Sequence, residues 1–438
     1  MNLNKDLLTP YQTLYIFKTP MKVKACILFL IVILFFQNAL FAQRAYNTWY
    51  FGLGAGIDFN SGSPVVITNG KTNTREGVAT FSNPATGKLL FYTDGETVWD
   101  AYHRVMPNGS GLLGDGSSCQ SGVIVPNPDV YTDGLNKHIY YLFTTSSNMN
   151  GFQGFRYNIV DMSLNGNGKT SGDIKQKNTL LLANNTERIG SVKHSNGKDF
   201  WIVTLERFTN KYYAYKVTRN GVNTTPVVSQ VGYTMRETRD IVGYLKFSEN
   251  GQKMATAFYG SDQVQIFNFD NTTGKISSDD VITLHHLQSA YGIEFAANGD
   301  LLYVSQLIGA INKIGRVWQF DLRSNNETTI NQNKLLLNST PNQGYGALQR
   351  APDRKIYVAS EIGYNGPVAY LDVINNPDAF GVGAHYQRKA IYLQGKKTLI
   401  GLPNFISTTT ITHLNIPKLR KATFKYNKAS ITLNTGDR

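Results

Sequence analysis

Charged and amide side chains recur just before a series of glycines along this chain. The runs are Thr-Arg-Glu-Gly (74–77), Cys-Gln-Ser-Gly (119–122), Thr-Glu-Arg-Ile-Gly (186–190), Thr-Arg-Asp-Ile-Val-Gly (238–243), Gln-Ser-Ala-Tyr-Gly (288–292) and Asn-Gln-Gly-Tyr-Gly (342–346). Such groups bind ligands when a fold gathers them on one concave surface. The candidate ligand-binding residues are therefore Arg75, Glu76, Gln120, Glu187, Arg188, Arg239, Asp240, Gln288 and Gln343.

The same residue types could instead neutralise one another. Buried charges need partners, and neighbouring acids and arginines such as Glu76 and Arg75 supply them. A metal ion held by Glu76, Glu187 and Asp240 would require the oxygens of all three residues to converge. We expect no metal ion and no cofactor, and structural pairing and ligand binding stay open as alternatives.

Signatures of catalysis are missing from the sequence. It has no G-x-S-x-G elbow, no H-E-x-x-H, no P-loop and no D-x-D-x-D-G calcium loop. Among the histidines, only His285 and His286 come near the glycine runs. Cys119 is the only thiol after residue 42, which excludes an internal disulfide or a C-x-x-C site. We expect Cys119 to be a small core residue, because buried thiols behave as hydrophobes.

The elements that must position these residues are β-strands. The chain has 40 Gly, 25 Tyr and 23 Phe, and short runs rich in β-branched and aromatic residues alternate with Asn-Gly, Asp-Gly and Thr-Gly turns. Examples are 88–100, 137–147, 199–206, 300–307 and 354–361. Closely spaced strands with glycine-rich turns indicate a sandwich, a barrel or a propeller. The strand aromatics Trp99, Trp201, Tyr303, Trp318 and Tyr357 should fill the core.

A longer repeat decides among these folds. Similar units begin near 77, 121, 190, 243, 291 and 345, and repeats of about 40–50 residues with four strands each are typical of propellers. We predict an all-β fold: a single β-propeller of about seven blades, with six or eight as alternatives. The fragments 49–62 and 401–414 should together complete the last blade, with 401–408 as its inner strand beside 49–59, because an open ring would expose strand edges.

This architecture gives the glycine runs a common place. In a propeller, the connection into the innermost strand lies on the face where the central channel opens. The nine candidate residues should therefore surround the channel mouth. The glycines that follow should allow close approach of the crowded inner strands.

The N-terminal region indicates export. Residues 21–42 contain Lys22 and Lys24, an uncharged apolar stretch from Ala25 to Phe36 and a small residue at Ala42, the layout of a signal peptide. Gln37 and Asn38 make the stretch too short for a transmembrane span, so we expect none in the mature chain. The predicted divisions are an N-terminal extension with signal peptide at 1–42, a propeller at 43–414 and a basic tail at 415–438.

The net charge does not indicate a nucleic-acid partner. The formal charge is +13, yet the positive residues are scattered outside the C-terminal tail. Scattered charge is typical of a solvated surface, so we expect no nucleic-acid binding. A glycan, a peptide or another envelope component is the expected partner.

The stretches WYFGLGAGIDFNSGSPVVITNG, LLFYTDGETVWDAYHRVMPNG and GLPNF carry a family resemblance. The region 47–406 resembles the N-terminal propeller of large exported adhesin-like proteins of Bacteroidetes, linked to type IX secretion and gliding motility. The resemblance implies a cell-surface or secreted protein, and it transfers no catalytic residues. Those proteins continue into further modules and a sorting domain, whereas only a basic tail follows GLPNF here. We therefore expect a truncated member, with a periplasmic location also open.

Two functions are compatible with the sequence. The first is a non-enzymatic binding or scaffold module. The alternative is a propeller hydrolase of lactonase-like plan that uses channel residues as acid, base or metal ligands. Carboxylates converging on one point would favour the hydrolase, whereas Arg–Glu pairing would favour the module.

Overall fold

The computed structural model describes residues 44–132, 134–147, 151–168, 171–309 and 313–407, together with the short strands β31 (Lys425–Asn427) and β32 (Ser430–Thr432). The signal peptide and its cleavage before Gln43 lie outside the described residues, as does most of the basic tail. No helix within the described ranges is long and apolar enough to cross a lipid bilayer.

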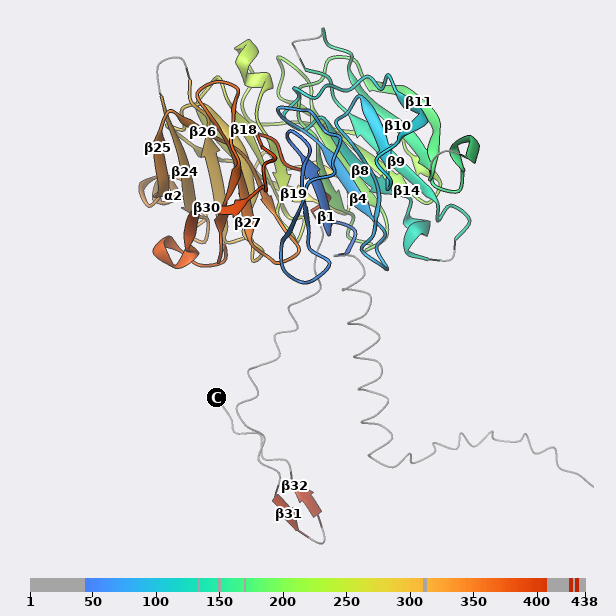
Figure 1. Cartoon of the computed structure of the whole chain (residues 1–438). Helices are drawn as coiled ribbons and strands as arrows, with labels where there is room; N and C mark the ends of the chain where they lie inside the picture. Colours follow the sequence, from blue (N-terminus) through green and yellow to red (C-terminus); the bar gives the residue numbers. More distant parts are fainter. Residues whose placement is uncertain are drawn as a thin grey trace, which may run out of the picture. The chain divides into compact units, whose positions relative to one another are not determined.

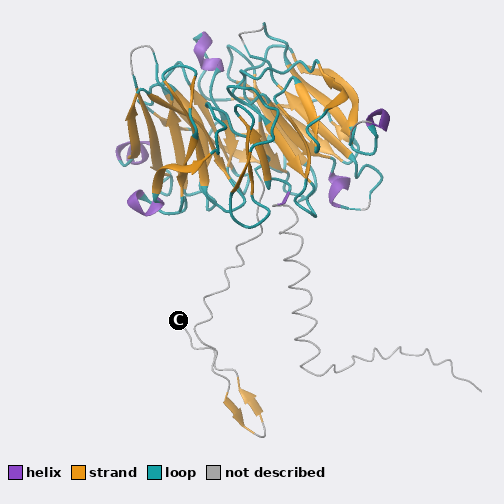
Figure 2. Cartoon of the chain, in the orientation of Figure 1, coloured by secondary structure: helices purple, strands orange, loops and turns teal. Residues whose placement is uncertain are grey.

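Seven antiparallel sheets, here called blades 1 to 7, form the ring (Figures 1 and 2). Blade 1 holds β1 (Thr48–Phe51), β2 (Ala55–Asp58) and β3 (Val65–Ile67), and blade 2 holds β4 (Ala79–Ser82), β5 (Leu89–Thr93), β6 (Thr97–Asp100) and β7 (Val105–Ser110). Blade 3 holds β8 (Gly122–Pro126), β9 (Ile139–Thr144), β10 (Phe155–Asp161) and β11 (Asp173–Leu182). Blade 4 holds β12 (Gly190–Lys193), β13 (Phe200–Leu205), β14 (Lys211–Thr218), β15 (Gly221–Val222) and β16 (Val227–Gln230).

The remaining blades follow the same order along the chain. Blade 5 holds β17 (Leu245–Phe247), β18 (Lys253–Phe258), β19 (Gln263–Asp270), β20 (Lys275–Ile276) and β21 (Ile282–Leu284). Blade 6 holds β22 (Ala290–Phe295), β23 (Leu301–Gln306), β24 (Ile314–Asp321) and β25 (Leu335–Pro341). Blade 7 holds β26 (Gln343–Arg350), β27 (Ile356–Ile362), β28 (Gly366–Pro367), β29 (Tyr370–Ile374) and β30 (Tyr386–Tyr392). The connections contain α2 (Glu327–Gln332) and the 3₁₀ turns η1 (Pro128–Tyr131), η2 (Gly166–Gly168), η3 (Thr238–Ile241) and η4 (Gly381–Ala384).

This arrangement confirms the predicted all-β propeller with seven blades. Its core lies between the blades, where side chains of facing sheets interdigitate. Trp99, Trp201, Tyr303 and Tyr357 are buried as expected. Trp318 is the exception, because its indole is only partly buried.

The ring closes by a different route from the predicted one. The fragment 401–407 does not pair with β1 or β2; its backbone instead bridges Val78 beside β4 and Val192 in β12. The expected shared blade is therefore wrong in this detail. The first strand of a blade lies nearest the axis, and β1 already takes that place in blade 1. The two ends of the ring meet elsewhere: the N–H of Leu53 in blade 1 donates to Lys397 O, just after β30 of blade 7, at 2.9 Å. The rings of Trp49 and Tyr357 also pack between these blades, at 5.5 Å.

Residues 400–407, called here the axial segment, run through the centre of the ring. The N–H of Ile400 donates to Arg75 O (3.1 Å), and Ile400 O accepts from the N–H of Ala347 (2.7 Å). Further along, the N–H of Asn404 donates to Val78 O (2.9 Å), and that of Ser407 donates to Ser191 O (2.9 Å). The segment therefore hydrogen-bonds to the inner strands of several blades.

The axial segment explains two of the repeat glycines. A Cβ on Gly401 would lie 1.6 Å from Glu76 O, and a Cβ on Gly346 would lie 2.3 Å from Ile400 O. No side chain fits at such distances, so the predicted role of these glycines in close approach is confirmed. The crowding arises from a chain segment on the axis as well as from the inner strands.

Candidate ligand site at the mouth of the central channel

A cavity of about 260 Å³, called here the axial cavity, opens at the end of the channel where the chain enters the inner strands. Its lining includes Arg75 and Glu76 before β4, Glu187 before β12, Tyr291 on β22 and Glu361 on β27. Ser117, Val242, Tyr259, Leu307, Ile308, Tyr364 and Asn365 complete it. Three of the nine candidate residues, Arg75, Glu76 and Glu187, therefore meet where the glycine runs placed them.

Arg75 links two acids across this cavity. Its guanidinium donates to Glu76 Oε1 at 2.6 Å and to Glu361 Oε1 at 2.9 Å. Burial alone would favour the neutral form, but the charges of Glu76 and Glu361 outweigh it and raise the pKa of Arg75. The ring of Tyr364 lies 4.7 Å from the guanidinium, and 75% of Tyr364 is exposed. The expected Arg–Glu pairing is thus present, and an aromatic face lies beside it.

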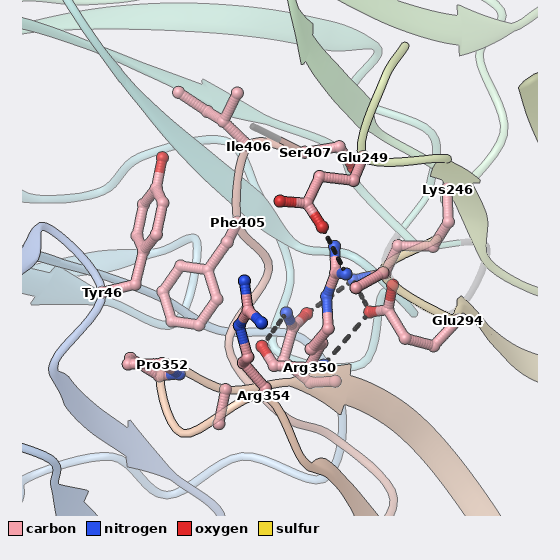
Figure 3. A pocket seen from close by; sticks show the side chains of 13 residues that line it. Tyr46, Lys246, Glu249, Glu294, Arg350, Pro352, Arg354, Phe405, Ile406 and Ser407 are labelled. Atoms are coloured by element: carbon pink, nitrogen blue, oxygen red, sulfur yellow. Dashed lines mark hydrogen bonds and ion pairs between the residues drawn. The ribbon is translucent and has the colours of Figure 1, made fainter. Parts of the chain in front are cut away.

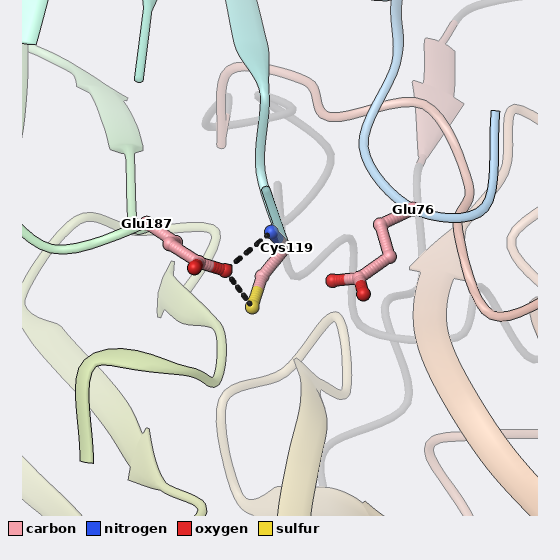
Figure 4. A group of neighbouring side chains, drawn as sticks. All are labelled: Glu76, Cys119 and Glu187. Carbon is pink, nitrogen blue, oxygen red and sulfur yellow. Dashed lines mark hydrogen bonds between the residues drawn. The ribbon is translucent and has the colours of Figure 1, made fainter. Parts of the chain in front are cut away.

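Glu76, Cys119 and Glu187 form a buried group beside the pair (Figure 4). One ligand atom from each lies within 4.8 Å of the other two. The thiol and the backbone N–H of Cys119 both donate to Glu187 Oε2, each at 3.4 Å. On the other side, the hydroxyl of Tyr291 donates to Glu76 Oε2 at 2.7 Å.

Burial sets the protonation of this group. It raises the pKa of Glu76 to about 7, although the charge of Arg75 acts in the opposite direction. The pKa of Cys119 is raised well above its ordinary value by burial and by the nearby Glu187 and Glu76. Glu76 can therefore exchange a proton near neutral pH, whereas Cys119 stays a thiol and is a poor nucleophile.

Among the residues that the structure describes, these three form a group that could hold a metal ion. A thiolate with carboxylate oxygens is a ligand set that zinc accepts. A metal would have to displace the proton of Cys119, which the neighbouring acids help to retain. Asp240, which the sequence placed with Glu76 and Glu187 in a hypothetical metal site, does not line the cavity.

Three other candidates have structural contacts inside the protein. Gln120 donates to Leu245 O (3.1 Å) and to Asn404 Oδ1 (3.2 Å), which joins blade 5 to the axial segment. Arg188 is fully buried and donates to backbone carbonyls, including Ala257 O at 2.6 Å. Burial lowers the pKa of Arg188. Asp240 accepts a hydrogen bond from the hydroxyl of Tyr233 at 3.0 Å.

The last three candidates do not line the axial cavity. Arg239 is exposed and pairs with Glu237 at 3.5 Å. Gln343 donates to Ser360 Oγ at 2.9 Å. Gln288 is exposed and lines a separate groove. The spacing in the sequence located the loops, but it did not say which side chain of each loop turns toward the channel.

Sequence reasoning missed Tyr291, Glu361 and Tyr364 as members of the site. Tyr291 directly precedes the repeat glycine Gly292, so the same glycine pattern could have found it. Glu361 lies at the end of the second strand of blade 7, and the Gly363 that follows it is not one of the glycines that open a repeat unit. Cys119 was expected in the core, and it is indeed buried, but its thiol contacts Glu187.

A second cavity lies at the opposite end of the channel (Figure 3). It is lined in part by Phe405, Lys246 and Arg350, and its volume is about 80 Å³. Lys246 donates to Gln349 Oε1 at 2.5 Å, and Arg350 pairs with Glu249 at 2.7 Å. This cavity has less than a third of the volume of the axial cavity, and its charged groups are paired with one another. Its paired charges therefore act in packing around the axial segment.

Fold and site together define the class as a seven-bladed β-propeller with a polar cavity at one end of its channel. No protein-family model matches the chain, and no curated protein does either. A putative 6-phosphogluconolactonase from Bacteroides fragilis shares 12% identity, covering 82% of this chain and 97% of that one, with a TM-score of 0.45. The periplasmic gluconolactonase of Pseudomonas aeruginosa shares 15% identity with this chain. The match covers 72% of this chain and 81% of that one, with a TM-score of 0.40.

Hydrazine synthase of Kuenenia stuttgartiensis is similar over a smaller part of its length. The identity is 11%, the TM-score is 0.37, and the match covers 60% of this chain and 63% of that one. Likeness at these levels carries no argument about activity. The function must be argued from the cavity itself.

Proposed function

We propose that this chain is a non-catalytic recognition module that takes its ligand into the axial cavity. The observation that supports this most is the double pairing of Arg75 with Glu76 and Glu361 in the cavity lining. A paired arginine holds the two carboxylates in place, the hydroxyl of Tyr291 and the N–H of Asn365 donate to their other oxygens, and each carboxylate oxygen can accept a further hydrogen bond. Rigid acceptors of this kind suit binding without chemistry.

The lining favours a ligand rich in hydrogen-bond donors. It contains three carboxylates, Glu76, Glu187 and Glu361, but Arg75 is its one arginine, and it contains no lysine among the described residues. An anionic group would meet an excess of negative charge there. The exposed ring of Tyr364 provides a flat apolar face at the same place. Sugar hydroxyls or a peptide amino group can donate to the carboxylates, and an apolar part of the same ligand can lie on the ring of Tyr364. We therefore propose a glycan or a peptide as the ligand.

The proposed setting is outside the cytoplasm, at the cell surface or in the medium, or in the periplasm. The signal-peptide pattern at 21–42 and the resemblance to Bacteroidetes surface propellers support it. In that setting a binding module would serve adhesion or scaffolding, as the resemblance implies. N-terminal sequencing of the exported protein tests the processing step: the mature chain should begin at Gln43, and retention of Met21 would contradict export with cleavage.

The test of the cavity starts from an array. The fragment 43–438 is screened against glycans and peptides, and the strongest ligand is then titrated by calorimetry into the unchanged fragment and two variants. Glu361→Gln removes a cavity carboxylate at nearly constant volume, so we expect binding to weaken by about tenfold or more. The control, Glu237→Gln, changes an acid outside the cavity and should leave the affinity unchanged. Equal affinity in all three proteins would rule out the cavity as the site.

One observation favours the lactonase-like hydrolase as a second candidate. Glu76 has a pKa raised to about 7, which suits a general acid or base at neutral pH. This function would require the carboxyl of Glu76 to leave its bond with Tyr291 and face the substrate. Hydrolysis of sugar lactones by the unchanged protein, lost in Glu76→Gln, would establish it. No turnover in either protein would remove this candidate.

A further inference from the structure

A larger groove, called here the lateral groove, lies between blades 5 and 6. Its volume is about 680 Å³, within the range of about 300–1,000 Å³ found for ligand sites. Its lining includes Asp262 before β19, His285 and His286 after β21, Gln306 at the end of β23, and Arg316 and Trp318 on β24. The groove opens on the same face as the axial cavity, because Leu307, which follows Gln306, lines that cavity.

Trp318 supplies an aromatic wall that is held in a fixed orientation. Its indole N–H donates to Gln306 Oε1 at 2.6 Å. Gln306 is 1% exposed and in turn donates to Gln288 O at 2.7 Å. The indole is only partly buried, unlike the other strand aromatics expected in the core. A partly exposed ring that is fixed by a buried amide is a suitable platform for stacking.

Arg316 and Trp318 are two residues apart on β24, so their side chains lie on the same face of the strand, and both line the groove. Within the described residues, Arg316 has no ion pair, and its guanidinium donates to Ile314 O on its own strand at 3.4 Å. The ammonium of Lys334 lies 5.4 Å from the Trp318 ring. Two acids lie nearby: Asp262, which lines the groove and accepts from the N–H of Ser289, and Glu327, which accepts from His285. A negatively charged ligand would therefore meet an available guanidinium beside an aromatic face.

We propose that the lateral groove binds an acidic polysaccharide, with a sugar ring stacked on Trp318 and its acid group paired with Arg316. The C–H face of a sugar ring is apolar and flat enough to cover the indole, which accounts for the aromatic wall. A carboxylate or sulfate on the ring matches the guanidinium, which binds such groups through two parallel hydrogen bonds. The length of a polysaccharide fits a groove that is open to solvent. This site does not depend on the axial cavity, whose lining contains three carboxylates.

Calorimetry with the 43–438 fragment tests the proposal. The probes are an oligogalacturonate, a heparin-derived oligosaccharide and a neutral maltooligosaccharide of matched length, which separate carboxylate, sulfate and uncharged sugars. We expect at least one acidic probe to bind more tightly than the neutral one. Trp318→Ala and Arg316→Gln should each weaken that binding by about tenfold. The matched control Arg323→Gln alters an exposed arginine just beyond the other end of β24 and should have no effect.

Two results would overturn the proposal. One is the absence of binding by both acidic probes, and the other is binding that Arg316→Gln and Trp318→Ala leave unchanged in variants that melt like the unchanged protein. If Trp318→Ala does not fold, Trp318→Phe keeps an aromatic face and should retain part of the affinity, while Arg316→Gln still tests the charge. Glu361→Gln should not alter binding in the lateral groove, which separates this site from the axial cavity.

Discussion

At the scale of single residues, Cys119 shows how burial decides chemistry. Its thiol donates to Glu187 and accepts from the N–H of Gly243 at 3.2 Å. The same burial and the two adjacent acids raise its pKa, so the thiolate needed for nucleophilic attack is scarce. Cys119 thus connects the loop before β8 to the loops before β12 and β17. Its role is structural, although it lies next to the cavity.

The replacement Cys119→Ala should destabilise the fold and leave ligand binding intact. Removing the sulfur deprives buried groups of a partner, which costs about 1–3 kcal/mol. Urea unfolding measures the loss, and calorimetry with the array ligand measures binding. Cys119→Ser, which keeps a donor and an acceptor, should recover part of the stability. Loss of binding in a folded Cys119→Ala variant would show that the thiol takes part in recognition.

Glu76 should make stability depend on pH. Its pKa is raised from 4.5 to about 7 in the folded state, so the folded protein holds a proton that the unfolded chain releases. This contribution is therefore complete below about pH 4.5 and is lost as the pH rises through about 7. The groups facing Glu76 are Arg75, Tyr291, Cys119 and Glu361.

Urea unfolding at about pH 5 and about pH 8 measures this effect, with Glu76→Gln as the comparison. The unchanged protein should lose more stability over this interval than the variant, because the amide introduced by the replacement cannot titrate. The measurement reports the difference between the two proteins, so other titrating groups cancel. A larger loss in the variant would mean that the folded-state pKa of Glu76 is lowered instead.

At the scale of elements, the axial segment is the part that the sequence predicted least well. The repeat glycines and turn signals predicted the blades because each strand leaves a local pattern. The path of residues 400–407 depends on contacts with several blades, which leave no local pattern. One signal was available: Pro403 lacks an N–H and is a poor inner strand residue. Its presence argued against the predicted shared blade.

The replacement Asn404→Ala should test the axial segment as a stabilising element. The side chain of Asn404 is 3% exposed, donates to Ile189 O at 3.0 Å and accepts from Gln120 at 3.2 Å. Leaving these buried groups unpaired costs about 1–3 kcal/mol each. Thermal unfolding should show a clear drop in the midpoint, whereas the exposed control Asn220→Ala should be nearly neutral. A neutral Asn404→Ala would mean that the segment contributes little to closing the ring.

At the scale of the whole molecule, the two ends of the described propeller meet on one face of the ring. The rings of Tyr46 and Phe405 lie 4.6 Å apart, at the end of the channel opposite the axial cavity. A partner attached through either end would therefore leave the cavity and the lateral groove facing away from it. The sequence predicted that the loops before the inner strands share one side, and Arg75, Glu76 and Glu187 from these loops do line one cavity. It could not predict the site's members, because side-chain direction depends on packing between blades.

The structure of the 43–438 fragment bound to the ligand selected by the array tests the central claim most directly. The account predicts that the ligand lies in the axial cavity, with a donor group within hydrogen-bond distance of the carboxylate of Glu361 and an apolar face against Tyr364. Arg75 should keep its bonds to Glu76 and Glu361, as expected for rigid recognition. A ligand found elsewhere on the propeller, with the axial cavity unchanged, would contradict the account.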